Sequence, residues 1–487
     1  MQKPRIVILG LDGLSLDMFL RLAKDNRFRN FHKVFKKSFI RVHESIPPTT
    51  PVGWTSIITG VNPALHGIWG FTKPVFHPRK GILHRFYNSY DVKYPRLFEM
   101  TAIFGIKSLV INYPLTYPLK ALYLKNNAIV SDTLLGIKPE FHPTTLKQYE
   151  EFFKTSNGSN IHEKILRMID GIEILSDKVD WNLLICMLDA PDKLFHKDIR
   201  IISRLKGADL EVFNAIDNLI GHFINIADNL IIVSDHGLKI YRKWISPLAA
   251  LYTYKILNNQ LTTLPDAIIQ NLVRIIYGSK HLSLIHFLIG KIITSKNILT
   301  DSLFNKIKKE TFNTKISVDI ADPDNVWLIY FINEELRNTC EKILSKYFAD
   351  LLDINRPENI FNGPYFPELP SLFIKPKFVN DYYVFFSEFS KYFTKLKFSY
   401  RIVGRHHPLG VFIAYGWKIK HNVDLKNPIR PYDMVPTVLA MLQLPIPSKT
   451  DGRVLPITPY LKGKYFPTYN YLTALKIAKI KKKLKRL

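Results

Sequence analysis

The stretch that decides the fold is LIIVSDHG, residues 230–237, in which a short apolar run ends directly in Ser234, Asp235 and His236. A continuous apolar run of this length is typical of a strand that is buried on both faces of a parallel sheet. The stretch IVILGLDG, residues 6–13, has the same form and ends in Asp12. In open α/β sheets, ligands bind beyond the carboxyl ends of the strands. Both stretches therefore predict a functional cluster at one edge of a sheet.

Further strands of this kind are expected at Lys107–Ile111 and Leu183–Leu188, and the second of these is followed by Asp189 and Asp192. Longer segments with helical spacing separate the apolar runs. Strands that alternate with helices indicate an α/β layered architecture. We therefore expect a mostly parallel central sheet that is flanked by helices.

We expect the core to be interrupted by one insertion. Residues 1–243 form the first part of the core, whereas Trp244–Phe312 has the texture of amphipathic helices and predicts a helical cap. Residues 313–462 return the chain to the core through the apolar runs Val326–Ile332 and Gly410–Gly416. Residues 432–447 predict a helix with Pro436 in its first turn, which later prolines stop. Residues 463–487 form a separate basic tail.

The composition excludes some classes of protein. Of the 487 residues, 47% are hydrophobic, so the chain can bury a large core and is neither disordered nor collagen-like. A net charge of +27 favours anionic partners such as phosphate esters, nucleic acid or acidic lipid headgroups. Two cysteines, Cys186 and Cys340, are too few for a disulfide framework. Neither a signal peptide nor an apolar run of membrane-spanning length is visible, so we expect a cytoplasmic protein, soluble or peripheral to a membrane.

The tail, Lys476–Leu487, has its own pattern. Four apolar residues fall on one helical face, and seven lysine and arginine side chains surround it. This pattern is typical of a contact with an anionic membrane or with nucleic acid. The alternative is a solvated, frayed terminal helix, which the pattern fits equally well.

Polar residues at the predicted strand ends and in two loops suit the binding of divalent metals. Three carboxylates, three imidazoles and one hydroxyl would supply mixed oxygen and nitrogen ligands, which favour zinc, manganese or iron over calcium. Two metals held close together stabilise the attacking and leaving oxygens of a phosphoryl displacement. The candidates are Asp12, Thr50, Asp192, His196, Asp235, His236 and His406.

Each candidate also has an ordinary structural interpretation. An aspartate at the end of a buried strand, such as Asp12, is often only a helix N-cap. Asp192 and His196 have the spacing of successive helical turns, so they lie on one face and could simply form an ion pair. His406 is followed by His407, and either could be a surface residue. The pair Asp235–His236 is more suggestive, because a buried carboxylate beside a buried imidazole is costly unless both are paired or ligating.

Thr50 lies at a predicted helix start. Three prolines at residues 47, 48 and 51 force an extended loop, after which Val52–Thr59 has helical character and ends at Gly60. Backbone N–H groups at such a helix start favour negative charge, so a hydroxyl there could become a nucleophile and its phosphorylated form would be stabilised. The alternative is that Thr49 or Thr50 is only an N-cap.

Five ordered motifs resemble the type I phosphodiesterase/nucleotide pyrophosphatase family of the alkaline phosphatase superfamily. They are GLDG, PPTTPVGWTSIITGVNPALHGI, DAPDKLFH, VSDHG and GRHHPLGVFIAYG. Further segments, near Asn112, near Pro364 and up to Leu455, look like the prokaryotic and archaeal members. The resemblance extends from Ile6 to about Leu455, apart from most of the insertion, and implies an alkaline phosphatase-like core.

The resemblance also implies two metal sites and a nucleophile. One site would use Asp12, Thr50, Asp235 and His236, and the other Asp192, His196 and His406, with His406 rather than His407 matching the family's ligand. The metals would be two divalent ions, zinc or manganese. Thr50 matches the position that attacks phosphorus to give a phosphothreonine, which water then hydrolyses. The implied activity is hydrolysis of a phosphodiester or pyrophosphate bond in a small phosphate ester or nucleotide.

The sequence departs from the family at the HGI motif. Phe71 stands where eukaryotic-type members carry an asparagine that holds a phosphate oxygen, and Gly70 replaces an acidic residue of the prokaryotic relatives. Nucleotide specificity is therefore open. The alternatives are a phosphomutase, a phosphonate or phosphomonoester hydrolase of the same superfamily, or a peripheral-membrane enzyme that acts on lipid headgroups. The oligomeric state is not indicated.

Overall fold

The computed structural model describes most of the chain outside residues 246–315 and 385–402. The described residues are 3–119, 126–133, 136–154, 160–202, 204–241, 243–245, 316–319, 327–377, 379, 382–384, 403–417, 419–421, 423–425, 427–458, 461 and 465–484.

The centre of the molecule is an eight-stranded sheet with the strand order β2-β18-β9-β1-β8-β5-β6-β7. Five neighbouring strands, β9, β1, β8, β5 and β6, run parallel, whereas β18, β2 and β7 pair antiparallel. The expectation of a mostly parallel sheet is confirmed. The bounds are β1 (Ile6–Leu11), β2 (Ser38–Glu44), β5 (Ser108–Tyr113), β6 (Asn127–Ser131), β7 (Phe141–His142), β8 (Leu183–Leu188), β9 (Asn229–Val233) and β18 (Leu409–Gly416).

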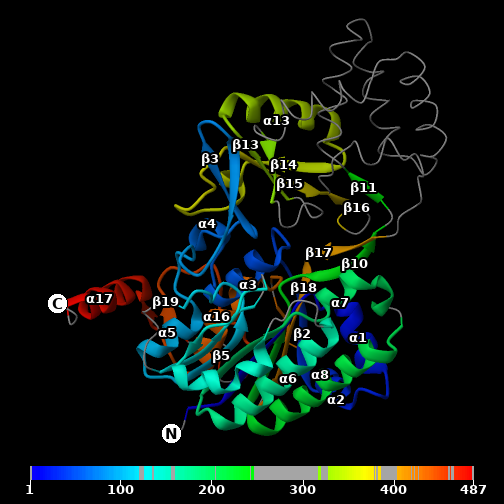
Figure 1. Cartoon of the computed structure of the whole chain (residues 1–487), viewed down its shortest axis with the longest axis vertical. Coiled ribbons are helices and arrows are strands. Elements are labelled where there is room, and N and C mark those ends of the chain that lie inside the picture. Colours follow the sequence, from blue (N-terminus) through cyan, green and yellow to red (C-terminus); the bar gives the residue numbers. More distant parts are fainter. Residues whose placement is uncertain are drawn as a thin grey trace, which may run out of the picture.

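Helices cover both faces of this sheet (Figure 1). Successive residues of β1 alternate between the two cores, because Val7 and Leu9 pack with one set of helices and Ile6 and Ile8 with the other. This alternation explains why the strand is a continuous apolar run. One face carries α1 (Leu16–Lys24), α2 (Arg29–Lys36), α6 (Ile161–Lys178) and α8 (Gly207–Ile226), and the other carries α3 (Thr50–Thr59), α5 (Leu97–Ile103) and α16 (Met434–Met441).

A second, four-stranded antiparallel sheet stands apart from the main one in Figure 1. Its order is β12-β13-β15-β14, and the expected return of Val326–Ile332 to the core is therefore wrong: β13 (Leu328–Phe331) belongs here, while β18 does return to the main sheet. The sequence of an apolar strand does not indicate whether that strand belongs to the main sheet or to the second sheet. The other elements of this part are β12 (Ile316–Ser317), β14 (Leu352–Asn355), β15 (Ser371–Pro376), α13 (Glu334–Phe348), α14 (Pro357–Ile360) and the hairpin of β3 (Thr72–His77) and β4 (Gly81–Phe86).

Shorter elements complete the described chain. Among them, α7 (Asp192–Lys197), the 3-10 turn η2 (Ile199–Ile202), β10 (Gly237–Tyr241) and β17 (Val403–His407) form the surroundings of the candidate site. The rest are α4 (Pro63–His66), η1 (Thr144–Phe153), β11 (Lys243–Ile245), β16 (Tyr382–Val384), η3 (Pro431–Asp433), β19 (Ile446–Pro447), β20 (Thr468–Tyr469) and α17 (Tyr471–Leu484).

The predicted helical cap lies almost wholly outside the described residues. Its first residues differ from the expectation, because Trp244 and Ile245 belong to β11, which pairs with β16. Residues 246–312 remain a prediction. Within the described chain, helices that combine the length and apolarity needed to cross a bilayer are absent.

Candidate active site

Backbone hydrogen bonds bring two strand ends together at the edge of the main sheet. The N–H of Asp12, just after β1, donates to the carbonyl oxygen of Leu188 at the end of β8 at 3.1 Å. The N–H of Asp192, at the start of α7, then donates to the carbonyl oxygen of Asp12 at 3.0 Å. The two aspartates, 180 positions apart in the sequence, therefore stand on adjoining turns. The β9 turn, with Asp235 and His236, lies on the other side of β1.

Asp12, Asp235 and His236 form the first group of side chains. The Nε2 atom of His236 lies 3.5 Å from Oδ1 of Asp12 and 3.2 Å from Oδ2 of Asp235, and all three residues are buried. The other ring nitrogen of His236, Nδ1, is 3.1 Å from the carbonyl oxygen of Gly237 and donates to it. That hydrogen bond fixes the tautomer and leaves a lone pair on Nε2, facing the carboxylates.

Asp192, His196 and His406 form the second group. Oδ1 of Asp192 is 3.3 Å from Nε2 of His196 and 3.3 Å from Nε2 of His406, and the two Nε2 atoms are 3.0 Å apart. Nδ1 of His406 donates to the carbonyl oxygen of Pro48 at 3.1 Å, which again leaves Nε2 to face the group. His196 and Asp192 share one side of α7, as their spacing predicts.

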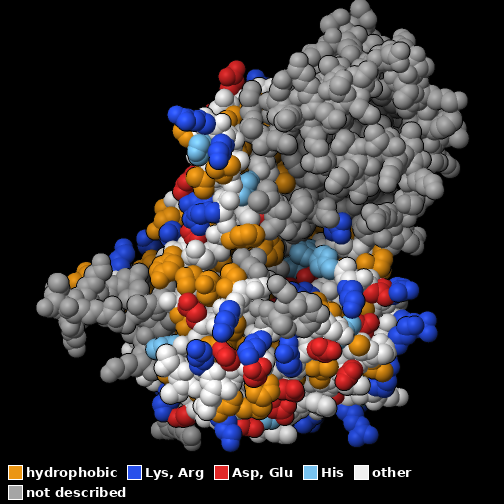
Figure 2. All heavy atoms as spheres, in the orientation of Figure 1, with side chains coloured by type: hydrophobic (Ala, Val, Ile, Leu, Met, Phe, Trp, Pro, Cys, Tyr) orange, Lys and Arg blue, Asp and Glu red, His pale blue; other side chains and the backbone are white. Residues whose placement is uncertain are grey.

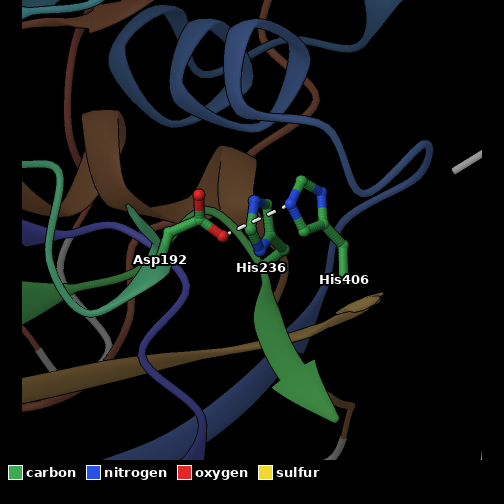
Figure 3. Close-up of side chains that lie close together, drawn as sticks. All are labelled: Asp192, His236 and His406. Carbon is green, nitrogen blue, oxygen red and sulfur yellow. Dashed lines mark ion pairs between the residues drawn. The ribbon is translucent and has the colours of Figure 1, made fainter. Parts of the chain in front are cut away.

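The two groups adjoin each other. The rings of His236 and His406 stack with centroids 3.9 Å apart, and Figure 3 shows them beside the carboxylate of Asp192. In Figure 2, histidine and acidic side chains gather where the layer of the main sheet meets the upper part of the molecule. His236 is thus within ligand distance of both groups.

Burial makes this collection of charges costly. Burial, followed by the nearby charges of Asp235 and Asp192, raises the pKa of Asp12 well above its ordinary value. Burial and Asp192 raise the pKa of Asp235 to about 7. Burial lowers the pKa of His236, and the charge of His406 lowers it further. Burial also acts to raise the pKa of Asp192, but His406 and His196 outweigh it and hold that pKa well below its ordinary value.

The buried ligand-type atoms fit a metal centre. Oδ1 of Asp12, Oδ1 of Asp192, Oδ2 of Asp235 and Nε2 of His236 are buried and have no hydrogen-bond partner within the described residues. The 3.3 Å contacts of Asp192 with the imidazoles are close but are not aligned as hydrogen bonds. Buried carboxylates are rarely left without partners, and oxygen with imidazole nitrogen is the donor set of zinc, manganese and iron. The residues therefore fit divalent cations.

Two contacts place Thr50 at this site. Thr50 is the first residue of α3 and is buried. Pro48, two residues earlier, accepts the hydrogen bond of His406, and Gly53, one turn later, lies so close to Asp235 that an added Cβ would be 2.8 Å from its Cβ. The N-cap residue of α3 is Thr49, whose side chain makes no capping hydrogen bond. A helix-capping hydrogen bond therefore does not explain why residues 49 and 50 are threonines.

His407 does not join the cluster. Its Nδ1 accepts a hydrogen bond from the N–H of Leu409 at 3.2 Å, and burial lowers its pKa to about 4. The structure therefore brings His406, and not its neighbour, to Asp192. All seven sequence candidates occupy this one edge of the sheet.

Two further positions escaped the sequence analysis. Lys193, directly after Asp192, forms an ion pair with Asp189. His43, on β2, donates from Nε2 to the carbonyl oxygen of Ser234 at 2.8 Å and so supports the turn that carries Asp235. The i, i+4 spacing of Asp189 and Lys193 could have revealed the first, whereas no local pattern marks His43.

Gly70 and Phe71, which follow the HGI motif, lie against the side chain of Asp319. A Cβ on Gly70 would overlap the carboxylate of Asp319, which accepts hydrogen bonds from the N–H of Phe71 and, at 2.8 Å, from the hydroxyl of Thr72. Ile68, which precedes this loop, packs in one apolar cluster with Val52. Val52 lies in the first turn of α3. The loop with Gly70 therefore follows a residue that shares an apolar cluster with the first turn of α3, and the carboxylate of Asp319 lies against the backbone of the loop.

The sheet, with acidic and histidine side chains at its carboxyl edge and a threonine at a helix start, gives the chain an alkaline phosphatase-like α/β fold. Residues 6–263 match the family model of type I phosphodiesterase/nucleotide pyrophosphatase, which is more than half of the chain. The chain belongs to this family and is a hydrolase that acts on phosphoric ester or pyrophosphate bonds.

Solved structures share the fold. Phosphonoacetate hydrolase from Sinorhizobium meliloti 1021, in complex with phosphonoformate, aligns with a TM-score of 0.57 and 13% identity over 91% of this chain and 99% of its own. Human ectonucleotide pyrophosphatase/phosphodiesterase 5 aligns with a TM-score of 0.54 and 14% identity over 93% of this chain and 97% of its own. An inactive form of the murine protein, in complex with AMP, has a TM-score of 0.52 and 13% identity over 93% of this chain and 98% of its own. A comparison with curated proteins finds no match.

Proposed function

We propose that this enzyme cleaves phosphodiester or pyrophosphate bonds of small substrates in a metal-dependent reaction with Thr50 as the nucleophile. The observation that carries the proposal is the convergence of three buried carboxylates and three imidazoles beside the start of α3. The family supports the class of reaction. Asp12, Asp235, His236 and Thr50 would hold one divalent ion, and Asp192, His196 and His406 the other.

When bound, two divalent ions supply Lewis acidity for the attacking and leaving oxygens. The residues of the chain position the reactants. Thr50 gives up its hydroxyl proton to solvent and attacks phosphorus; the bond from the threonine oxygen to phosphorus forms, and the bond from phosphorus to the leaving-group oxygen breaks. The N–H groups in the first turn of α3 stabilise the anionic phosphate oxygens. Water then cleaves the phosphothreonine and regenerates the hydroxyl.

A pair of model substrates tests the proposal. Hydrolysis of bis-p-nitrophenyl phosphate and p-nitrophenyl phosphate should be measured with zinc or manganese and with a chelator. We expect a chelator-sensitive preference for the diester. Preference for the monoester would favour a phosphatase or mutase, and a lack of metal-dependent turnover of either compound would contradict the proposal for these substrates.

A variant of the nucleophile tests its role. Thr50→Ala should abolish turnover and leave the metal content nearly unchanged. Thr59→Val is a matched control, because it removes a buried hydroxyl from the other end of α3, where that hydroxyl donates to the carbonyl oxygen of Thr55. Wild-type activity in Thr50→Ala would exclude the phosphothreonine.

The alternative of a phosphonate substrate has one specific support. Phosphonoacetate hydrolase, the neighbour with the TM-score of 0.57, is in complex with phosphonoformate. Release of phosphate from phosphonoacetate, at a rate above that of the diester, would favour this alternative.

We also propose that the C-terminal helix contacts anionic membrane surfaces. Tyr471, at the start of α17, is buried and donates to the carbonyl oxygen of Pro445 at 2.7 Å, which anchors the helix. Farther along, Ile477 and Ile480 are 47% and 58% exposed, and Figure 1 shows the helix projecting from the body. A cytoplasmic, membrane-peripheral location is consistent with this contact.

Deletion of residues 476–487 should weaken binding to phosphatidylserine vesicles. Unchanged binding would exclude the contact, and binding to polynucleotide instead would favour nucleic acid as the partner.

A further inference from the structure

A chain of four polar side chains links the β3–β4 hairpin to the edge of the second sheet. Its members are Thr72 on β3, His84 on β4, Ser317 on β12 and Asp319, two residues after Ser317. In the register of the hairpin, Thr72 pairs with Phe86, so Thr72 and His84 are diagonal neighbours on one face. The hairpin stands beside the second sheet in Figure 1, and β12 is an edge strand of that sheet. None of the four is a proposed metal ligand or the proposed nucleophile of the active site.

The hydrogen bonds of this chain fix the position of each proton. The hydroxyl of Thr72 donates to Oδ1 of Asp319 at 2.8 Å. A hydroxyl has one proton, so the oxygen of Thr72 accepts the proton on Nδ1 of His84, 3.0 Å away. The other nitrogen of His84, Nε2, then carries a lone pair and accepts from the hydroxyl of Ser317 at 2.6 Å. The carbonyl oxygen of Val318, at 3.4 Å, is the weaker partner of that hydroxyl.

The charges of the chain suit a proton transfer from serine to histidine. Burial lowers the pKa of His84, so its imidazole is neutral near pH 7 and can take a proton. The positive charge that forms on His84 is stabilised through the hydroxyl of Thr72 by the carboxylate of Asp319. A hydroxyl, a base within hydrogen-bond distance and a group that orients the base are the parts of a nucleophilic site. His84 and Ser317 are only half-buried, so a small molecule can reach them.

We propose that Ser317 is the nucleophile of a second hydrolytic site, which takes small carboxylic esters with an apolar acyl group. His84 is the base, and Thr72 and Asp319 are positioning residues that act through it. Phe86 is 50% exposed and lies two residues after His84 on the same face of the hairpin, where it would contact the acyl group. This assignment does not depend on the reaction at the active site.

The reaction needs water as its only co-reactant. Oγ of Ser317 attacks the carbonyl carbon of the ester, and the serine proton moves to Nε2 of His84. The bond from the carbonyl carbon to the alcohol oxygen breaks, and the alcohol leaves with the proton from His84. Water then gives a proton to His84 and attacks the acylated serine. The carboxylic acid leaves, and Ser317 regains its proton from His84.

Labelling with diisopropyl fluorophosphate tests the nucleophile. The full chain is treated in the presence of a chelator, which suppresses the proposed metal-dependent reaction at Thr50, and its peptides are analysed by mass spectrometry. We expect a label on Ser317, where the bond from Oγ to phosphorus forms as fluoride leaves and the serine proton passes to His84. His84→Ala should slow this labelling by about a hundredfold or more. Ser448→Ala is the control, because it removes an exposed hydroxyl just after β19, and it should keep the wild-type rate.

Two results of this labelling would overturn the proposal. One is a folded wild-type chain without a label on Ser317, and the other is an equal rate of labelling in the wild type and in His84→Ala. Label on Thr50 that disappears with the chelator reports on the active site alone, so failure of one proposal is distinguishable from failure of the other.

Variants of Thr72 test the link between His84 and Asp319. Thr72→Val removes the linking hydroxyl and keeps the shape of the side chain, so it should slow labelling of Ser317 by about tenfold or more. Thr72→Ser keeps the hydroxyl and should restore the rate. Because Thr72 is buried, each variant is also checked by thermal melting. A wild-type rate in Thr72→Val, or a rate in Thr72→Ser that is as low as in Thr72→Val, would overturn the positioning role.

Hydrolysis of p-nitrophenyl butyrate tests the class of substrate. With the chelator present, we expect turnover by the wild type and Ser448→Ala and its loss in Ser317→Ala. Equal turnover by the wild type and Ser317→Ala would overturn the assignment of carboxylic esters to this site. The diester assay with added metal remains the separate test of the active site.

Discussion

Gly53→Ala probes the contact that positions the proposed nucleophile. Gly53 lies in α3, one turn after Thr50, and an added Cβ would stand 2.8 Å from Cβ of Asp235 and 3.0 Å from its carbonyl oxygen. Ordinary Cβ contacts begin at 3.4 Å, so the helix or the β9 turn must move by about 0.6 Å. Both carry residues of the candidate site, and the movement therefore separates Thr50 from Asp235.

Gly53→Ala should affect the rate of catalysis more than the stability of the fold. Overpacking of a core costs about 1–3 kcal/mol, and alanine in a helix recovers about 1 kcal/mol relative to glycine, so the net loss of stability is about 0–2 kcal/mol. A displacement of roughly 1 Å can cost about a hundredfold in rate. We expect kcat/KM for bis-p-nitrophenyl phosphate to fall about tenfold to a hundredfold, while urea denaturation shows a folded protein.

Gly105→Ala is the control for stability without a change at the site. Nothing lies within 4 Å of an added Cβ there, but the backbone φ of +76° is strained for alanine, which costs about 1–2 kcal/mol. Its specific activity should equal that of the wild type. If Gly53→Ala retained a kcat/KM within twofold of the wild type, the close packing of α3 on Asp235 would not set the position of Thr50.

Three further outcomes follow from the buried titratable side chains. Because the pKa of Asp235 is raised from 3.8 to about 7, the folded, metal-free protein binds more protons than the unfolded chain in this interval, so its stability falls as the pH rises, and Asp235→Asn should reduce this slope in urea titrations. Zinc at about a hundredfold excess over its Kd should stabilise the metal-free chain by about 2.7 kcal/mol, and Asp192→Asn should shrink the shift in Tm; equal shifts would exclude Asp192 as a ligand. His43→Ala leaves the Ser234 carbonyl oxygen without its buried donor and opens a cavity, so we expect a loss of about 2–4 kcal/mol in denaturation, whereas a loss below 1 kcal/mol would contradict the supporting role of His43.

The main sheet could be predicted because its strands carry their own signal. Ile6–Leu11 and Leu183–Leu188 are strands with the predicted bounds, and each is buried on both faces. A residue that faces either layer of helices must be apolar, so the run is continuous and ends where the chain leaves the layers. Asp12 and Asp235 come directly after the ends of their strands, where the chain has left the two layers of helices. Only this edge of the sheet gives polar atoms access to a ligand.

The grouping of the site residues depends on contacts that no local pattern records. Asp12 meets Asp192 through a backbone hydrogen bond between distant turns, and His406 is oriented by the carbonyl oxygen of Pro48. Strand pairing sets these contacts, and pairing partners cannot be derived from the apolar runs themselves. The place of β13 in the second sheet was missed for the same reason.

The loop after the HGI motif has a carboxylate beside it that the loop's own sequence does not contain. The sequence has Gly70 in this loop, where the resemblance to the family implies an acidic side chain. In the fold, the carboxylate of Asp319 fills the space that a side chain at residue 70 would take, and it binds the backbone of Phe71. A Cβ at this position would overlap that carboxylate, so the side chain of Asp319 would have to shift. The carboxylate beside this loop comes from a residue about 250 positions later in the chain, so the side chains that surround the loop cannot be inferred from the loop's own sequence.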